Sequence, residues 1–347
     1  MKGRESQMTQ SQTGDGSTNV QASRDVYIGV SYSEARQIAL DVYNGNLVKF
    51  SEEAANRALA KVEILNEQFL NTLYKELPDY IHKLALPAVQ VSLLNTQKEY
   101  AINDDKELEN NLLNLLIDRI KSEERSQKQI ALDQAILTIP KLSKDQINAL
   151  TLIFSFVYWS ISPKNIRDFK EAWKNKILPF IPVTDPGHSF FSHIQATGNL
   201  VTMEKGNSYN IQKILLSKYK AVFIKGFRIA EFESEFQNIQ PTLIKSIHNE
   251  SLVQYKAIND NTLESELKAA GLHQHLSRFK SFQDRFLMSL PEIDQFMTSL
   301  DIDWKRFYKY FSDSEFASLR PSSSGFAIAV LNYKNHTGEE IDLERLM

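Results

Sequence analysis

The spacing of apolar residues between residues 51 and 138 constrains the fold more than any other feature of the sequence. Apolar side chains recur there every three or four positions, which is the period of a helix that buries one face. We expect helices near residues 51–77, 87–101, 106–123 and 126–138, and a preceding helix with Ser33 as its N-cap. The seam of the longest helix consists of Ala58, Val62, Leu65, Phe69, Leu73 and Leu77. The pattern predicts an antiparallel helical bundle.

The most apolar window of the chain lies at residues 149–162. It follows Ser143–Gln146, whose sequence SKDQ is typical of a capping box that opens a helix. The window is shorter than the roughly 20 residues that a membrane-spanning helix needs, and Pro163 closes it. We therefore interpret it as a helix of the protein core, with contact to a membrane as the alternative.

The second half of the chain has a more mixed pattern. Three prolines within residues 179–186 indicate a change of organisation. Residues 190–206 are expected to form a β-hairpin with Gly198 and Asn199 in its turn. We expect helices on both sides of Pro241 within residues 231–247. The apolar stretch at residues 324–338 is predicted to be a helix that packs against this half of the chain.

A short β-like segment precedes all of these helices. Residues 18–22 and 25–30 are strand candidates, because Val26, Ile28 and Val30 alternate with other residue types. Two strands of this length are marginal by themselves, so their main-chain groups need partners. The strands can pair with the later hairpin, remain disordered, or stack against the same segment of neighbouring chains. We favour stacking, because the amides of Asn19 and Gln21 form ladders between identical strands.

Composition limits the classes of partner and chemistry. The chain has 347 residues, a formal net charge of −3 and no cysteine. This charge gives no reason to expect nucleic acid as the main partner. The lack of cysteine removes thiolate nucleophiles and sulfur-ligated zinc, and it fits a reducing, cytoplasmic location. No apolar signal-peptide core is present in residues 1–20.

No sequence motif identifies a catalytic site. The stretch GDGSTN at residues 14–19 lacks the lysine and the spacing of a phosphate-binding loop. Asp185, His188 and His193 are the metal-ligand candidates that we retain, although the five-residue spacing of the two histidines matches no common zinc pattern. We assign no catalytic residue and no cofactor, and we expect surface or hairpin roles for these three residues.

Three groups of residues carry a resemblance to a known family. Near the N-terminus the pattern GDxSTNxQA, then DVxIG, then SYxEAR occupies residues 14–36. Longer matching stretches lie within residues 97–154, within 193–227 and within 324–347. On these residues the chain resembles an uncharacterised, mostly helical bacterial family that is known only by locus tags. Its members often lie near conflict and antiphage genes, so the resemblance implies a role in defence.

These observations combine into one expected architecture. The fold class is mainly α, a helical bundle with a short N-terminal β-segment and a small β-hairpin insertion in the C-terminal half. We expect a disordered leader at residues 1–13, a β-type oligomerisation segment at 14–30, an N-terminal helical bundle at 31–162 and a C-terminal α+β domain at 163–347.

Three functions remain open on this basis. The first is a non-enzymatic interaction protein of a bacterial antiphage or stress-response system, which binds its own copies and another protein of that system. Its oligomerisation residues are expected to be Ser17, Asn19, Val20, Gln21, Arg24, Asp25, Val26 and Ile28. The second is a membrane-perturbing effector that releases the window at residues 149–162. The third is a metal-dependent hydrolase that uses Asp185 and His188. We favour the first.

Overall fold

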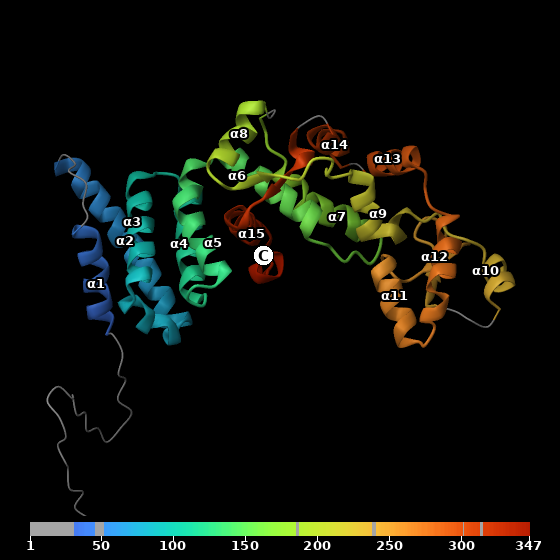
Figure 1. Ribbon diagram of the computed structural model, residues 1–347, viewed down its shortest axis with the longest axis horizontal. Helices are drawn as coiled ribbons and strands as arrows, with labels where there is room; N and C mark the ends of the chain where they lie inside the picture. Colours follow the sequence, from blue (N-terminus) through green and yellow to red (C-terminus); the bar gives the residue numbers. More distant parts are fainter. Residues whose placement is uncertain (1–30, 46–51, 185–186, 238–240, 301, 313–314) are drawn as a thin grey trace, which may run out of the picture.

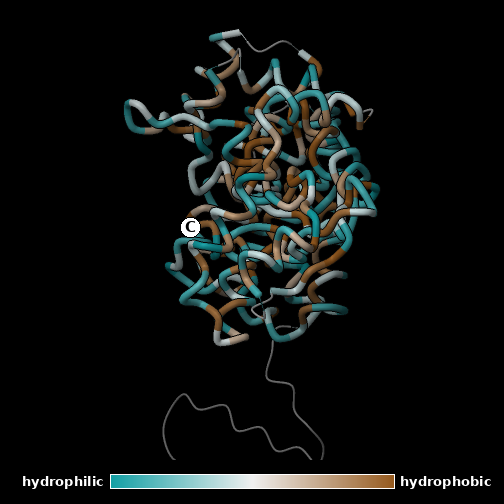
Figure 2. Tube along the Cα trace, turned by 90° about the vertical axis from the view of Figure 1, so that its right-hand side faces the viewer, coloured by the Kyte–Doolittle hydropathy of each residue, from teal (hydrophilic) through white to brown (hydrophobic). Residues whose placement is uncertain are grey.

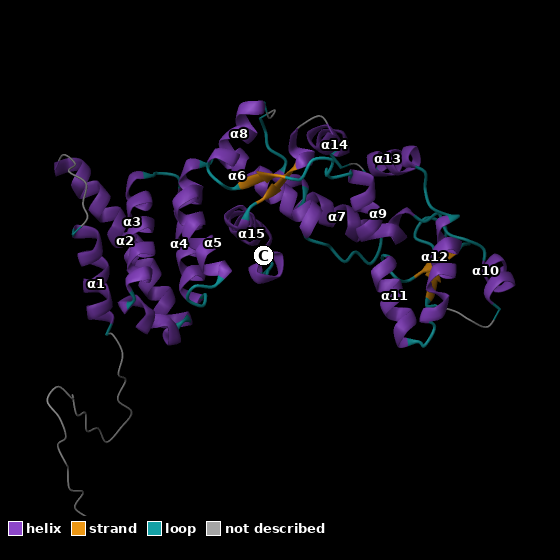
Figure 3. Cartoon of the chain, viewed as in Figure 1, coloured by secondary structure: helices purple, strands orange, loops and turns teal. Residues whose placement is uncertain are grey.

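The protein is mainly α-helical, as the apolar spacing predicts (Figure 3). The computed structural model describes residues 31–45, 52–184, 187–237, 241–300, 302–312 and 315–347. The leader and the β-type segment expected at residues 1–30 lie outside this range. The longer helices are α1 (Tyr32–Asn44), α2 (Glu52–Glu76), α3 (Pro87–Ile102), α4 (Lys106–Lys121), α5 (Gln127–Thr138), α6 (Lys144–Ile153), α7 (Ile166–Lys176), α8 (His188–Ala196), α9 (Ile211–Tyr219), α10 (Ile229–Phe236), α11 (Asp260–Ala269), α12 (Leu276–Asp284), α13 (Leu290–Ser299), α14 (Trp304–Ser312) and α15 (Ser323–Thr337).

Helices α1 to α5 stand side by side at one end of an elongated molecule (Figure 1). Their boundaries follow local signals, since α2 ends at Glu76 just before Pro78, and α3 begins at Pro87. The N-cap of α1 is Ser31 rather than the expected Ser33. Ser31 Oγ accepts a hydrogen bond from the Glu34 amide, and the Glu34 carboxylate accepts one from the Ser31 amide, because glutamate three residues after the cap completes a capping box.

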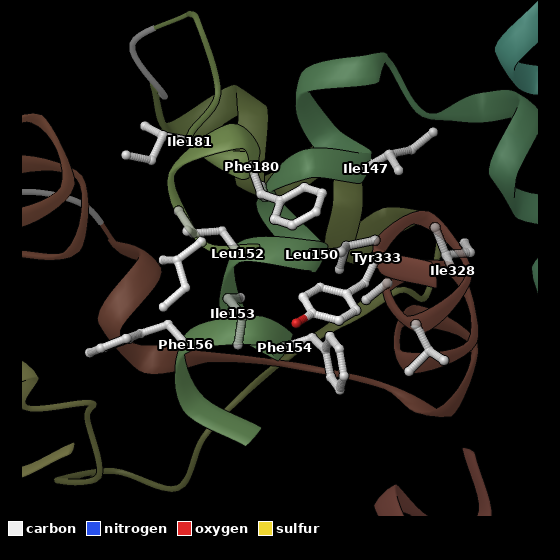
Figure 4. Packing of buried hydrophobic residues seen from close by; sticks show 14 of the residues in the cluster. Ile147, Leu150, Leu152, Ile153, Phe154, Phe156, Phe180, Ile181, Ile328 and Tyr333 are labelled. Carbon is white, nitrogen blue, oxygen red and sulfur yellow. The ribbon is translucent and has the colours of Figure 1, made fainter. Parts of the chain in front are cut away.

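The apolar window at residues 149–162 begins inside α6 and continues into a turn of π-helix at Phe154–Tyr158. The capping box at Ser143 and Gln146 is present as predicted. Residues 149–156 are all buried, which confirms the interpretation of this segment as core. Figure 4 shows Phe154 and Phe180 on either side of Tyr333, with ring centroids 5.4 and 5.8 Å from it. Among the described helices, none has both the length and the hydropathy for crossing a bilayer.

Helix α15 lies close to the C-terminus in the sequence and packs against helices of the N-terminal half. We expected it to pack against the C-terminal half, but its most extensive contacts are with α6 and α5, and it also touches α4 (Figure 1). Its N-terminus fits against the turn at Gly198 and Asn199, where Ser322 Oγ donates to the Gly198 carbonyl at 2.6 Å. A Cβ atom at Gly325 would overlap the Asn199 carbonyl oxygen, so this close approach requires glycine. With its N-terminus held at this turn, α15 has its C-terminal half near α4.

The described strands form two antiparallel pairs, and neither matches the expected hairpin at residues 190–206. Residues 188–196 form helix α8 instead, and β1 (Leu200–Thr202) pairs with the distant β4 (Leu319–Pro321). The turn at Gly198 is present, with a positive φ of 80°. The hairpin of the C-terminal half joins β2 (Leu243–Lys245) to β3 (Val253–Tyr255), where we expected a helix after Pro241. Tertiary pairing outweighs local preference in such three-residue strands.

Three clusters of buried apolar residues support this arrangement. One lies among α1 to α4, and one at the opposite end joins phenylalanines of α10 and α12 to the β2–β3 hairpin. The largest cluster lies between them and includes Leu150 and Phe154 as well as Trp173 and Phe307. Figure 2 shows the apolar segments gathered in the interior. The central cluster contains residues from both sides of position 162, and the division into two domains there stays a prediction.

Candidate functional site

A polar groove of about 610 Å³ lies between α4, the start of α6 and the end of α15. Five of the residues that line it are asparagines, which is an unusual concentration of one neutral polar side chain. Among the described residues, the lining consists of Lys106, Glu107, Asn110, Asn111, Asn114, Lys144, Asn332, Asn335 and His336. We call this feature the asparagine groove.

The sequence places these side chains by helical spacing. Asn110 and Asn114 are four residues apart on α4, so they lie on one face, while Leu112 and Leu115 of the same helix are fully buried. Asn332, Asn335 and His336 are likewise three and four residues apart on α15. The two polar faces meet because α15 packs beside α4.

Asn335 bridges the two helices. Its Nδ2 donates to Asn111 Oδ1 at 2.8 Å, and its Oδ1 accepts from Asn114 Nδ2 at 3.2 Å. Asn332 Nδ2 donates to Thr151 Oγ1 at 2.9 Å and to Asn148 Oδ1 at 3.2 Å. These bonds hold the carboxamides in fixed orientations across the groove.

Several side-chain amide atoms of these asparagines make no hydrogen bond within the described part of the chain. A carboxamide offers two N–H donors and a carbonyl oxygen with two lone pairs. The hydrogen bonds above use Asn111 only through Oδ1 and Asn332 only through Nδ2, and none involves the side chain of Asn110. Asn111 and Asn332 are nevertheless only 2% and 7% exposed. The groove therefore presents oriented donors and acceptors that a ligand can satisfy.

The lysines at the rim of the groove are paired with carboxylates of α4. Lys106 Nζ donates to Glu109 Oε2 at 2.8 Å, and Lys61 Nζ of α2 lies 2.9 Å from the other oxygen of the same carboxylate. Burial acts to raise the pKa of Glu109, but the hydrogen bond from Lys106 and the charge of Lys61 lower it further, so the net pKa lies below its usual range. Lys144 pairs with Glu107 at 2.5 Å, which raises the pKa of the lysine.

Of the residues singled out from the sequence, His188 and His193 lie in the described part of the chain, and neither lines this groove. The proposed oligomerisation residues and Asp185 lie outside the described residues. His188 is exposed, with its Nδ1 2.7 Å from Glu315 Oε1, and His193 Nε2 lies 2.8 Å from the Lys141 carbonyl oxygen. Within the described ranges, no group of three or more His, Cys, Asp or Glu side chains is arranged to hold a metal ion.

Sequence reasoning missed the asparagine groove although a signal was present. The apolar spacing predicts helices at residues 106–123 and 324–338 but assigns a binding face to neither of them. The overlooked pattern is asparagine repeated at helical spacing on the face opposite an apolar stripe. It occurs on α4 and again on α15. One sequence does not show that two such faces meet.

Comparison with known proteins places the helical body in one family. A single family model, described only as ":-like", matches residues 29–347. The chain belongs to this family. The match includes every helix and strand of the described structure, and both walls of the asparagine groove lie within it. No curated protein and no solved structure is significantly similar to the chain.

Proposed function

We propose that the protein is a non-enzymatic interaction protein that recognises a partner through the asparagine groove and assembles with its own copies through residues 17–28. The groove is the observation that carries the recognition part. It is a large depression whose floor is made of oriented, incompletely hydrogen-bonded carboxamides. A ligand whose polar groups pair with these carboxamide atoms gains affinity from the hydrogen bonds that it forms.

The rigidity of the groove supports a binding role. The Asn335 bridge and the contacts of Asn332 fix four side chains before any ligand arrives. The helices that carry them are anchored by buried apolar faces, including Leu115 on α4 and Ile328 on α15. A site whose groups are already oriented loses less conformational entropy on binding.

The sequence supports the assembly part. Residues 18–30 contain alternating apolar residues and the amides Asn19 and Gln21, which suit stacked identical strands. Within the described structure, β1 pairs with β4, and β2 pairs with β3. Each of these short strands therefore already has a neighbour. The role in bacterial defence that the family resemblance implies stays a prediction.

Light scattering on purified protein tests this proposal. We expect the intact chain to form an oligomer and the chain with Ile28→Pro to have a lower mass, because proline removes a main-chain donor from the strand. Asn335→Ala in the intact chain is the matched control and should keep the oligomer. Equal masses for the intact chain and the Ile28→Pro variant would contradict assembly through this segment.

A further inference from the structure

We infer that the ligand of the asparagine groove is an extended segment of a partner protein, held mainly through its main-chain N–H and C=O groups and carrying an acidic residue near Lys106 and Lys144. This inference rests on the proposed recognition role and specifies its chemistry. It follows from the spacing of the carboxamides, from their free atoms and from the charges at one end of the groove.

The spacing of asparagines on α4 suits an extended chain. A helix rises about 1.5 Å per residue, so Asn110 and Asn114 are about 6 Å apart along the axis of α4. An extended strand repeats after two residues, about 6.6 Å. Asn110 and Asn114 can therefore meet equivalent main-chain groups of an extended peptide that runs along the helix. A helical ligand would not offer free main-chain groups at this interval, because its own N–H and C=O groups pair with each other.

The chemistry of the free atoms matches a peptide unit. A carboxamide carries the same N–H donor and C=O acceptor as the main chain, so one asparagine can donate to a peptide carbonyl and accept from a peptide N–H. Asn110 has both functions available in the described structure, Asn111 has Nδ2 and Asn332 has Oδ1. Asn110 and Asn111 lie on α4 and Asn332 lies on α15. An extended peptide between these two helices can therefore form hydrogen bonds along both of its edges.

The charge at one end favours an acidic residue in the ligand. Lys106 and Lys144 stand in the first turns of α4 and α6, where they pair with Glu109 and Glu107, and a carboxylate of the ligand would replace these partners. The lysine side chains are 83% and 68% exposed, so both remain accessible to a carboxylate. The net charge of −3 argues against a polyanion such as nucleic acid.

Peptide selection on the intact protein provides the test. The probe is a displayed library of random ten-residue peptides in which one position is fixed as Asp or Glu. We expect selected peptides to bind the intact chain with affinity that falls about tenfold or more for Asn110→Ala and for Asn335→Ala. Asn261→Ala is the matched control, because this exposed asparagine of α11 lies outside the groove lining and should leave affinity unchanged.

Backbone methylation separates main-chain recognition from charge attraction. The best selected peptide is synthesised again with N-methyl groups at alternate residues, which remove N–H donors and keep every side chain. We expect these peptides to lose about tenfold or more in affinity. Undiminished binding by the methylated peptides would overturn main-chain recognition.

Two other outcomes would also overturn the inference. One is a library that yields no peptide bound more tightly by the intact chain than by Asn335→Ala. The other is Asn335-dependent binding of a ten-nucleotide oligothymidylate in place of peptides, which would leave the groove as a recognition site with a different ligand. Light scattering on the same samples reports assembly separately, so failure of the peptide inference and failure of assembly are distinguishable.

Discussion

Helix α4 carries two polar clusters that differ in charge and in exposure to solvent. In its C-terminal half, the fully buried Arg119 lies 3.0 Å from both Glu124 Oε1 and Asp133 Oδ1. Ser92 of α3 also donates to this Asp133 oxygen at 2.6 Å. In the N-terminal half, Asn110 and Asn111 line the groove with neutral amides, and some of their side-chain atoms make no hydrogen bond within the described structure. The first cluster is charged and closed to solvent around Arg119, although Arg119 Nη2 makes no hydrogen bond to any described residue, and the second is neutral and lies at an open groove.

This difference separates stability from recognition within one helix. A buried charge is strongly unfavourable without its partners, so the Arg119 cluster is sensitive to any loss of pairing. Neutral amides at an open groove can lack protein partners at little cost in stability, because water forms hydrogen bonds with them while no ligand is bound. We therefore expect substitutions in the closed cluster to lower the free energy of unfolding, and substitutions in the groove to lower ligand affinity.

The largest expected effect is that of Arg119→Ala. Removing the guanidinium deprives Glu124 and Asp133 of their partner and leaves a cavity, which should lower the free energy of unfolding by about 3 kcal/mol. Chemical denaturation measures this value. Lys121→Ala is the control, because the loose pair of Lys121 with Asp118 is partly exposed and should contribute less than about 0.5 kcal/mol. A loss below about 1 kcal/mol for Arg119→Ala would show that the cluster is not closed.

The next effect is expected at Glu109, the carboxylate of α4 that pairs with Lys61 and Lys106. Glu109→Gln keeps the shape but removes the charge that pairs with Lys61 and Lys106, so we expect a loss of about 1.5 kcal/mol at pH 7.

Glu109 also predicts how stability depends on acid. Its pKa in the folded protein lies below the unfolded value of 4.5, so its contribution is present above about pH 4.5 and is lost as the pH falls through the folded pKa. Denaturation at several pH values between 7 and 3 should show a shallower decline for Glu109→Gln than for the unchanged chain. Parallel curves would contradict this assignment.

A smaller loss is expected for Asn332→Ala, whose side chain belongs to both the core and the groove. The substitution removes the donor to Asn148 and Thr151 and should cost about 1 kcal/mol in thermal or chemical unfolding. It also removes the free oxygen from the groove, so affinity for the selected peptide should fall too. Loss of stability without loss of affinity would place Asn332 in the core alone.

The smallest change in stability is expected for Asn335→Ala. Asn335 is exposed, and its two partners become accessible to water when it is removed, so the free energy of unfolding should change by about 0.5 kcal/mol or less. Peptide affinity should nevertheless fall, because Asn111 and Asn114 lose their fixed orientation. A large loss of stability would mean that these asparagines serve to hold α4 and α15 together and not to bind a ligand.

Local sequence signals predicted much of the helical part of the fold. The apolar seam from Ala58 to Leu73 is buried in α2, as the helical period requires. The capping box at Ser143 and the stop before Pro78 set helix ends by short-range chemistry. These features depend on residues within a few positions of each other, which one sequence displays directly.

Long-range pairing was not predictable in the same way. Strand β1 pairs with β4 more than one hundred residues later, and α15 packs mainly against α5 and α6, which are far from it in the sequence. The groove depends on that same packing, because Asn335 reaches Asn111 only when α15 lies beside α4. Its residues were visible in the sequence, but their meeting was not.

The most direct test of the separation between the two clusters is a nitrogen-15 NMR titration of side-chain resonances with the selected acidic peptide. The Nδ2 signals of Asn110, Asn111 and Asn335 should shift in a saturable manner, while the Nε signal of Arg119 should stay in place. Unchanged asparagine signals at saturating peptide, or an equal shift at Arg119, would contradict the account of an open groove for recognition beside a closed cluster for stability.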